Sequence, residues 1–277
     1  MAKTVLIAGK DSPDGKKLAD GFAFTGRLVA VTGPEAEIDF KEKKTIAERR
    51  AEQASYEEAK SIEAQSGMCV FEWNKSSPIS SRSIILQTEN VFETLDEAVL
   101  YFDEEWFASN SDKLDSEQIA RGTDEMILSY EYLTLELLSR FEKKHTSFPG
   151  TLVFLLKEGP SASDALKNPL LRNGMSSIAS PLVASSASAF ATFAENVAAL
   201  FGDKNYVNIV LVRGDSSMET CSSDEALGKW LGNYLDSVEE LKVKIGAKKS
   251  VNWVKPGTKN VSQGFSLDTI TGIFSRK

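Results

Sequence analysis

The chain has 277 residues, of which 42% are apolar and 26% charged, and 32 Lys and Arg against 40 Asp and Glu give a formal charge of −8. This apolar content excludes a disordered chain, and no run reaches the about 18–20 apolar residues of a membrane span. The acidic balance argues against a nucleic-acid partner, and the only cysteines, Cys69 and Cys221, are too few for a disulfide framework or a zinc site. We therefore expect a soluble cytoplasmic protein with no nucleic-acid or membrane partner.

The N-terminal residues predict the start of a parallel sheet. A short apolar run at Thr4–Ala8 predicts a buried strand, and the apolar residues of Lys16–Phe24 have helical spacing. A second buried strand is expected at Leu28–Val31, and Thr32-Gly33-Pro34 closes it. Strand, glycine-bearing turn, helix and strand in this order open a βαβ unit, which requires parallel strands.

The remaining sequence continues this alternation. Further strands are expected at Met68–Trp73, Ala98–Phe102, Thr151–Leu156 and Val207–Val212, with a last one at Val251–Val254. Between them, helices are expected at Phe40–Gln65, Pro78–Phe92, Ser116–Lys144, Ser185–Phe201 and Asp224–Ile245, and an irregular segment at Glu158–Pro181. Six or seven strands alternating with helices predict a doubly wound α/β fold, with helices on both faces of a parallel sheet. Residues 1–255 are expected to form one domain, followed by a C-terminal tail at 256–277.

Local matches in a fixed order point to a family. Ala8–Gly15 has glycines on both sides of the turn after the first strand, Ser77-Pro78 opens the helix after the third strand, and Gly214 follows the sixth. In these features the chain resembles the short-chain dehydrogenase/reductases (SDRs) over roughly Lys3 to Val254. The resemblance implies a Rossmann-like fold, an NAD(P) site beyond the carboxyl ends of the strands, and a Tyr-x-x-x-Lys pair that takes part in hydride transfer.

The resemblance places the cofactor-binding positions at Gly9, Ser12, Gly15, Thr32 and Asn74. Gly9 and Gly15 keep the outer glycines of the family's phosphate turn, but Pro13 replaces the middle one, which fixes φ and removes an N–H donor. Thr32 stands where the family has an acid for the ribose hydroxyls or a basic residue for a 2′-phosphate. Asn74 stands where an Asp commonly contacts adenine. We expect a vestigial dinucleotide site that binds weakly or not at all.

The end of the fourth predicted strand also departs from the family. There the family continues with Asn-Asn-Ala-Gly, whereas this chain has Phe102-Asp103-Glu104-Glu105. Bringing an anionic dinucleotide against desolvated carboxylates costs free energy unless cations intervene. We expect the three acids to face solvent at the strand end, and a divalent metal bound by them remains an alternative.

The reactive groups of the family are missing at the matching positions. Ser185 stands in place of the Tyr, Ala189 in place of the Lys, and Ser129 near the place of a helix Asn. Another Tyr-x-x-x-Lys, Tyr56 to Lys60, lies in the charged helix after the second strand, and we attribute it to chance. The only histidine, His145, is expected at the charged end of a helix, where the helix dipole favours it. No catalytic site is therefore predicted.

Two functions remain open. The first is a non-catalytic, SDR-like interaction or structural module, which forms a homodimer or homotetramer through helices 116–144 and 185–201, as family members do. The alternative is an NAD(P)-dependent oxidoreductase with a displaced acid, Tyr130 or Tyr132. The apolar residues of Ser262–Lys277 are expected to pack on the domain itself or to bind a protein partner.

Overall fold

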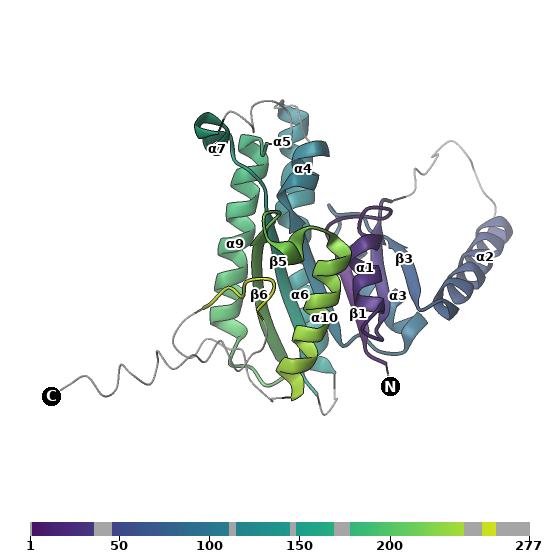
Figure 1. Ribbon diagram of the computed structural model, residues 1–277. Coiled ribbons are helices and arrows are strands. Elements are labelled where there is room, and N and C mark those ends of the chain that lie inside the picture. Colours follow the sequence, from purple (N-terminus) through teal and green to yellow (C-terminus); the bar gives the residue numbers. More distant parts are fainter. Residues whose placement is uncertain are drawn as a thin grey trace.

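A single parallel sheet of six strands organises the computed structural model, which describes residues 2–35, 46–110, 115–144, 148–168, 178–240 and 251–258 (Figure 1). The strand order is β3-β2-β1-β4-β5-β6. The strands are β1 Thr4–Ala8, β2 Leu28–Gly33, β3 Met68–Glu72, β4 Glu97–Asp103, β5 Gly150–Glu158 and β6 Val207–Asp215. The order changes direction between β1 and β4, and ligands of open α/β sheets bind at the carboxyl ends of such strands.

Helices cover both faces of the sheet, so the predicted doubly wound fold is confirmed. One face packs against α1 (Lys16–Ala23) and α10 (Asp224–Glu240), which lie in front of the sheet in Figure 1. The other face packs against α3 (Pro78–Phe92), α6 (Ser129–Lys143) and α9 (Pro181–Phe201). At the β3 edge, α2 (Ile46–Gln65) lies beside α3, where the Tyr56 hydroxyl donates to Oε1 of Gln87 at 3.1 Å.

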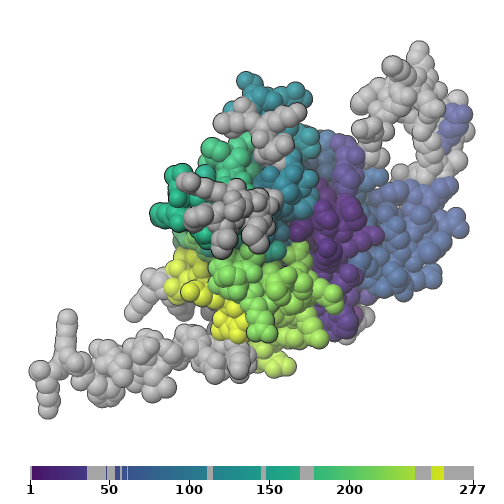
Figure 2. Space-filling view, turned by 45° about the horizontal axis from the view of Figure 1, so that its top comes forward, coloured from purple at the N-terminus to yellow at the C-terminus, as the bar shows by residue number. Residues whose placement is uncertain are grey.

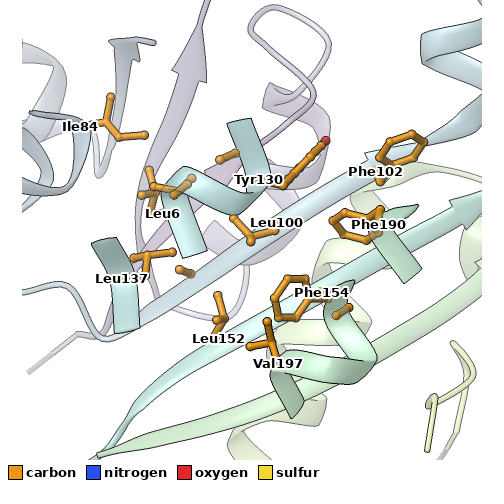
Figure 3. Packing of buried hydrophobic residues seen from close by; sticks show 14 of the residues in the cluster. Leu6, Ile84, Leu100, Phe102, Tyr130, Leu137, Leu152, Phe154, Phe190 and Val197 are labelled. Atoms are coloured by element: carbon orange, nitrogen blue, oxygen red, sulfur yellow. The ribbon is translucent and has the colours of Figure 1, made fainter. Parts of the chain in front are cut away.

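Aromatic rings fill the space between β4, α6 and α9. Phe102, at the end of β4, packs against Phe190 of α9 with ring centroids 5.4 Å apart and against Tyr130 of α6 at 5.8 Å. The rings of Tyr130 and Phe190 meet edge to face at 4.9 Å (Figure 3). All three side chains are buried. The hydrophobic core therefore continues up to the carboxyl end of β4, directly beneath the switch point.

Several element boundaries differ from the expected ones. Helix α9 begins at Pro181 rather than Ser185, because the Ser180 hydroxyl accepts a hydrogen bond from the Val183 N–H at 3.3 Å and proline suits the first helical position. The segment expected to be irregular, Glu158–Pro181, contains the short helix α7 (Ala162–Lys167). In place of the expected last strand, Val254 forms an isolated bridge to Val212 of β6.

The segment after β4 contains more helix than expected. A short helix, α4 (Glu104–Asn110), directly follows β4. The helix expected at Ser116–Lys144 is formed by α5 (Ser116–Thr123), a π-helical turn η1 (Asp124–Leu128) and then α6. No helix among the described residues has the length and apolar character needed to cross a membrane. His145, residues 40–45, residues 241–245 and the tail from 259 onward lie outside the described residues.

Glycines bring α1 and α10 into close contact. A Cβ atom on Gly228 of α10 would clash with the backbone oxygen of Leu18, and one on Gly21 of α1 would clash with the backbone oxygen of Glu225. Because α1 directly follows the first βα turn and α10 begins at the carboxyl edge of the sheet, this contact fixes the two helix starts relative to each other.

We predict that Gly228→Ala lowers the free energy of unfolding by about 1–3 kcal/mol, because the added methyl group meets a backbone atom that cannot move away alone. Gly122→Ala is the matched control. There the added Cβ would meet only the ends of the Leu182 and Met126 side chains, so we expect a change below about 1 kcal/mol. Urea denaturation measures both variants, and equal effects would contradict the importance of the α1–α10 contact.

Candidate functional site

The turn between β1 and α1 is shaped by its two outer glycines. Gly9 has a φ of +123°, and a Cβ atom there would clash with the backbone oxygen of Tyr101 and lie 2.5 Å from the Tyr130 hydroxyl. A Cβ atom on Gly15 would clash with the backbone oxygen of Lys10. Both glycines are thus required by contacts within the chain, so their retention alone is no sign of a bound ligand.

A buried group of charges lies beside this turn, at the carboxyl ends of β4 and β5. The ammonium group of Lys10 bonds Asp103 at 2.9 Å and Asp224, the first residue of α10, at 2.8 Å. From the end of β5, Lys157 bonds Asp224 at 3.2 Å and lies 3.6 Å from Asp103. The hydroxyl of Tyr101 is 3.1 Å from Asp103 and 2.9 Å from Asp224. We call these five residues the ionic cluster.

The ionic cluster corrects one expectation from the sequence. Asp103 was expected to face solvent, but its side chain is only 2% exposed and Asp224 only 5%. Side chains alternate along a strand, so Asp103 lies on the same face of β4 as Tyr101, toward α10. Two lysines neutralise the two aspartates at this position, and such pairing is what allows carboxylates to be buried.

Opposite charges in the cluster stabilise one another. Burial opposes ionisation of Lys10 and Lys157, but attraction to Asp103 and Asp224 outweighs it, and the pKa of both lysines is raised. Burial likewise opposes ionisation of Asp224, yet its bonds to Lys10 and attraction to Lys157 lower its pKa. The pKa of Tyr101 is raised well above its ordinary value by burial and by the two carboxylates. Lys10, Lys157 and Asp224 therefore keep their charge at neutral pH.

A second set of bonds ties the turn to β2 and to the loop after β3. The carboxylate of Asp11 accepts hydrogen bonds from the Thr32 hydroxyl at 2.9 Å and from the Lys75 ammonium group at 2.7 Å. Lys75 also donates to the backbone oxygen of Gly9 at 3.1 Å, and the Ser12 N–H donates to the backbone oxygen of Thr32 at 2.8 Å. Four of the predicted cofactor-binding residues, namely Gly9, Ser12, Gly15 and Thr32, therefore come together, and the chain's own groups bond the polar ones among them.

Trp106 of α4 lies against the same turn. Its indole N–H donates to Asp14 at 2.9 Å, and its backbone N–H donates to Asp103 at 3.2 Å. The ammonium group of Lys75 lies 5.6 Å from the centre of the Trp106 ring. Helix α4 thus covers the turn from the β4 side. In Figure 2 the purple N-terminal segment lies between the light-green segment that contains α10 and blue segments.

The side chain of Asn74, the fifth predicted cofactor-binding residue, forms hydrogen bonds with neighbouring residues. Its amide group donates to Glu35 at 2.7 Å and accepts from the N–H and the hydroxyl of Ser76 at 3.0 and 2.7 Å. The alternative of a metal site near the acids after β4 finds no support among the described residues, where no group of three or more His, Cys, Asp or Glu side chains is arranged to bind a metal ion.

The positions that the SDR resemblance assigns to catalytic residues are Ser129, Ser185 and Ala189. The Ser129 hydroxyl donates to the backbone oxygen of Glu125 at 2.7 Å, and the Ser185 hydroxyl donates to that of Leu182 at 2.9 Å, so each bonds within its own helical segment. Ala189 is a half-buried residue of α9. The hydroxyl of Tyr130 donates to the backbone oxygen of Tyr101 at 2.7 Å, and burial raises the pKa of Tyr130 well above its ordinary value.

Comparison with known proteins supports the fold on which these positions were assigned. No family model matches the sequence, and no curated protein matches it. A putative short chain dehydrogenase/reductase family oxidoreductase from Aeromonas hydrophila is similar in structure, with a TM-score of 0.55, 14% identity and coverage of 91% of this chain and 96% of that one. The chain has an SDR-like fold.

Two further solved structures agree with this. A putative 3-oxoacyl-reductase from Bacillus thuringiensis has a TM-score of 0.55 at 11% identity, over 92% of this chain and 96% of that one. A putative SDR from Sinorhizobium meliloti has a TM-score of 0.52 at 12% identity, over 84% and 88% of the two chains. At such low sequence identities, structural similarity establishes the arrangement of the helices and strands and nothing about the chemistry.

Sequence reasoning missed several residues of the site, namely Lys75, Tyr101, Trp106, Lys157 and Asp224. A signal for two of them was present. Lys75 and Lys157 lie at or just beyond the carboxyl ends of predicted strands, as Lys10 and Asp103 do, and these ends share one edge of a parallel sheet. Ion pairs between opposite charges at that edge could therefore have been predicted from the sequence. The contribution of Asp224 at the start of α10 could not be predicted in this way, because the position of a helix start depends on packing.

We predict that Asp224→Asn lowers the free energy of unfolding by about 3 kcal/mol or more at pH 7, because two buried lysines then share one carboxylate. The pKa of Asp224 is lowered below 3.8 in the folded state, so its stabilisation is fully present above about pH 4 and is lost as the pH falls through the folded value. The difference between wild type and variant should therefore shrink in acid.

The matched control is Glu225→Gln, which removes the neighbouring, exposed acid of the same helical turn. We expect it to change stability by less than about 0.5 kcal/mol. Urea denaturation between pH 3 and pH 7 measures all three proteins. Equal stability of the Asp224 variant and wild type at pH 7 would show that the ionic cluster does not hold the site together.

Proposed function

We propose that this chain is a non-catalytic SDR-like protein, which uses the doubly wound fold as an interaction or structural module. The observation that carries the proposal is that Lys10 and Lys75, two nearly buried cations at the first βα turn, are bonded to carboxylates of the chain itself. Lys10 is bonded to Asp103 and Asp224, and Lys75 to Asp11. A pyrophosphate at this turn would need such cations and would meet carboxylates.

The residues at the turn therefore do not fit a dinucleotide. Binding one would require separating buried ion pairs, and removing one partner of such a pair costs about 3–5 kcal/mol. Pro13 offers no N–H group to a phosphate, and the Ser12 N–H already donates to Thr32. The positions of the family's phenol and ammonium group hold Ser185 and Ala189, which cannot transfer or stabilise a proton in hydride transfer.

The alternative is an NAD(P)-dependent oxidoreductase with Tyr130 or Tyr132 as the acid. The fold alone supports it, and one fold serves many functions. A catalytic acid needs a pKa near the working pH, whereas burial raises the pKa of Tyr130. The Tyr130 hydroxyl also donates its hydrogen bond to the backbone oxygen of Tyr101. We therefore favour the non-catalytic function. The two free, buried cysteines suit the reducing cytoplasm that we propose as its location.

We predict that NADH and NADPH bind with a dissociation constant weaker than about 1 mM, because Lys10 and Lys75 are already paired with carboxylates of the chain. Isothermal titration calorimetry measures the binding, and the tryptophan fluorescence, to which Trp106 at the turn contributes, reports it independently. Saturable binding in the micromolar range by both methods would overturn the proposal and favour the oxidoreductase.

The proposal includes self-association through helices 116–144 and 185–201. Helix α9 contains one charged residue among 21, although 26% of the whole chain is charged. Its exposed positions are all uncharged: Pro181, Ser185, Ser188, Thr192, Asn196, Ala199 and Leu200. Beside it, α6 exposes 60% of Leu135. Depletion of charge is typical of the centre of a protein interface, so we propose that a second copy covers this face. The tail from residue 259 onward is a proposed docking segment for another protein.

We predict that the wild-type chain is a dimer or tetramer by size-exclusion chromatography with light scattering. Asn196→Glu should weaken the assembly by at least about tenfold, since a two-fold interface brings like charges together. Asn233→Glu, an exposed Asn on α10, is the matched control and should leave the mass unchanged. A monomeric wild type at high concentration would contradict this part of the proposal.

A further inference from the structure

Lys75 is a nearly buried cation with a single carboxylate partner. Its side chain is 9% exposed, and its ammonium group lies 5.8 Å from the ring centre of Trp73 and 5.6 Å from that of Trp106. Within the described part of the chain, Asp11 alone among the carboxylates lies within ion-pair distance of it, at 2.7 Å. Within that part of the chain, its other hydrogen bond is to the neutral backbone oxygen of Gly9.

The two partners differ in how they are held. Lys75 is fixed between two aromatic rings and reaches the turn from the loop after β3. Asp11 lies in the turn itself, its side chain is 16% exposed, and the Thr32 hydroxyl bonds its other oxygen at 2.9 Å. A cation and a hydroxyl donor thus converge on one carboxylate that borders solvent.

We propose that Lys75, Thr32 and the first βα turn form an oxyanion site, and that the carboxylate of Asp11 occupies it in place of an external ligand. A buried ammonium group that loses its counter-ion is costly, so a small oxyanion such as formate or phosphate binds there when the Asp11 side chain is removed. This inference rests on the proposed function, because it names the contact that closes the turn to the phosphates of a dinucleotide.

Asp14 offers a matched comparison within the same turn. It is exposed, and its carboxylate bonds the neutral indole N–H of Trp106 rather than a cation. Removal of Asp14 leaves no buried cation without a partner. Asp11→Ala and Asp14→Ala therefore remove the same group from one turn and differ in the charge that is left behind.

The test is thermal unfolding of wild type, Asp11→Ala and Asp14→Ala in sodium chloride and in sodium formate of equal ionic strength. In chloride, Asp11→Ala should melt about 6 °C or more below wild type. Formate should raise its melting temperature in a saturable way. Wild type and Asp14→Ala should melt equally in formate and chloride.

The double variant Asp11→Ala with Lys75→Met shows whether Lys75 is responsible. Methionine keeps an unbranched side chain between the two tryptophan rings but has no charge, so the formate effect should disappear. If Asp11→Ala does not fold in chloride, refolding it in formate, followed by circular dichroism, replaces the melting experiment, and folding that depends on formate supports the proposal. An Asp11→Ala protein that behaves alike in formate and chloride, or a formate effect that survives Lys75→Met, overturns it.

The same proteins separate this inference from the function on which it rests. NADH binding by the wild type would refute the non-catalytic function, whatever formate does to the variant. Absence of a formate effect in Asp11→Ala, with no NADH binding by the wild type, would refute the oxyanion site and leave the proposed function standing.

Discussion

The structure depends on the pairing of two buried lysines with two buried aspartates where β1, β4, β5 and α10 meet. Lys10 and Lys157 neutralise Asp103 and Asp224, and this pairing offsets the free-energy cost of burying the two carboxylates. The pairs join residues as far as 214 positions apart in the sequence. These ion pairs bury charged side chains at the carboxyl edge of the sheet, where open α/β folds bind ligands.

This pairing has a chemical consequence for the first βα turn. A phosphate site needs donors and cations that are free to meet the anion, and here Lys10, Lys75 and the Ser12 N–H already bond oxygens of the chain. The two remaining glycines of the turn are explained by close backbone contacts. The polar groups of the turn thus stabilise the fold, and this observation underlies the proposed non-catalytic function.

The sequence predicted the fold well because buried parallel strands appear as short apolar runs, and all six strands of the sheet were expected at nearly their observed places. It predicted the site poorly for a physical reason. An acidic stretch such as Asp103–Glu105 usually faces solvent, and only the tertiary structure brings Lys10 and Asp224 to Asp103. Helix α4 was missed in the same stretch, because its two initial acids resemble a loop until their place at a helix start is known.

The most direct test of a turn closed by its own charges is a crystal structure of the chain grown with millimolar NADPH. We predict that Lys75 remains bonded to Asp11 and Lys10 to Asp103 and Asp224, with no dinucleotide between the carboxyl ends of β1 and β4. A bound NADPH whose pyrophosphate lies on the Gly9–Gly15 turn, with Asp11 turned away from Lys75, would contradict this interpretation.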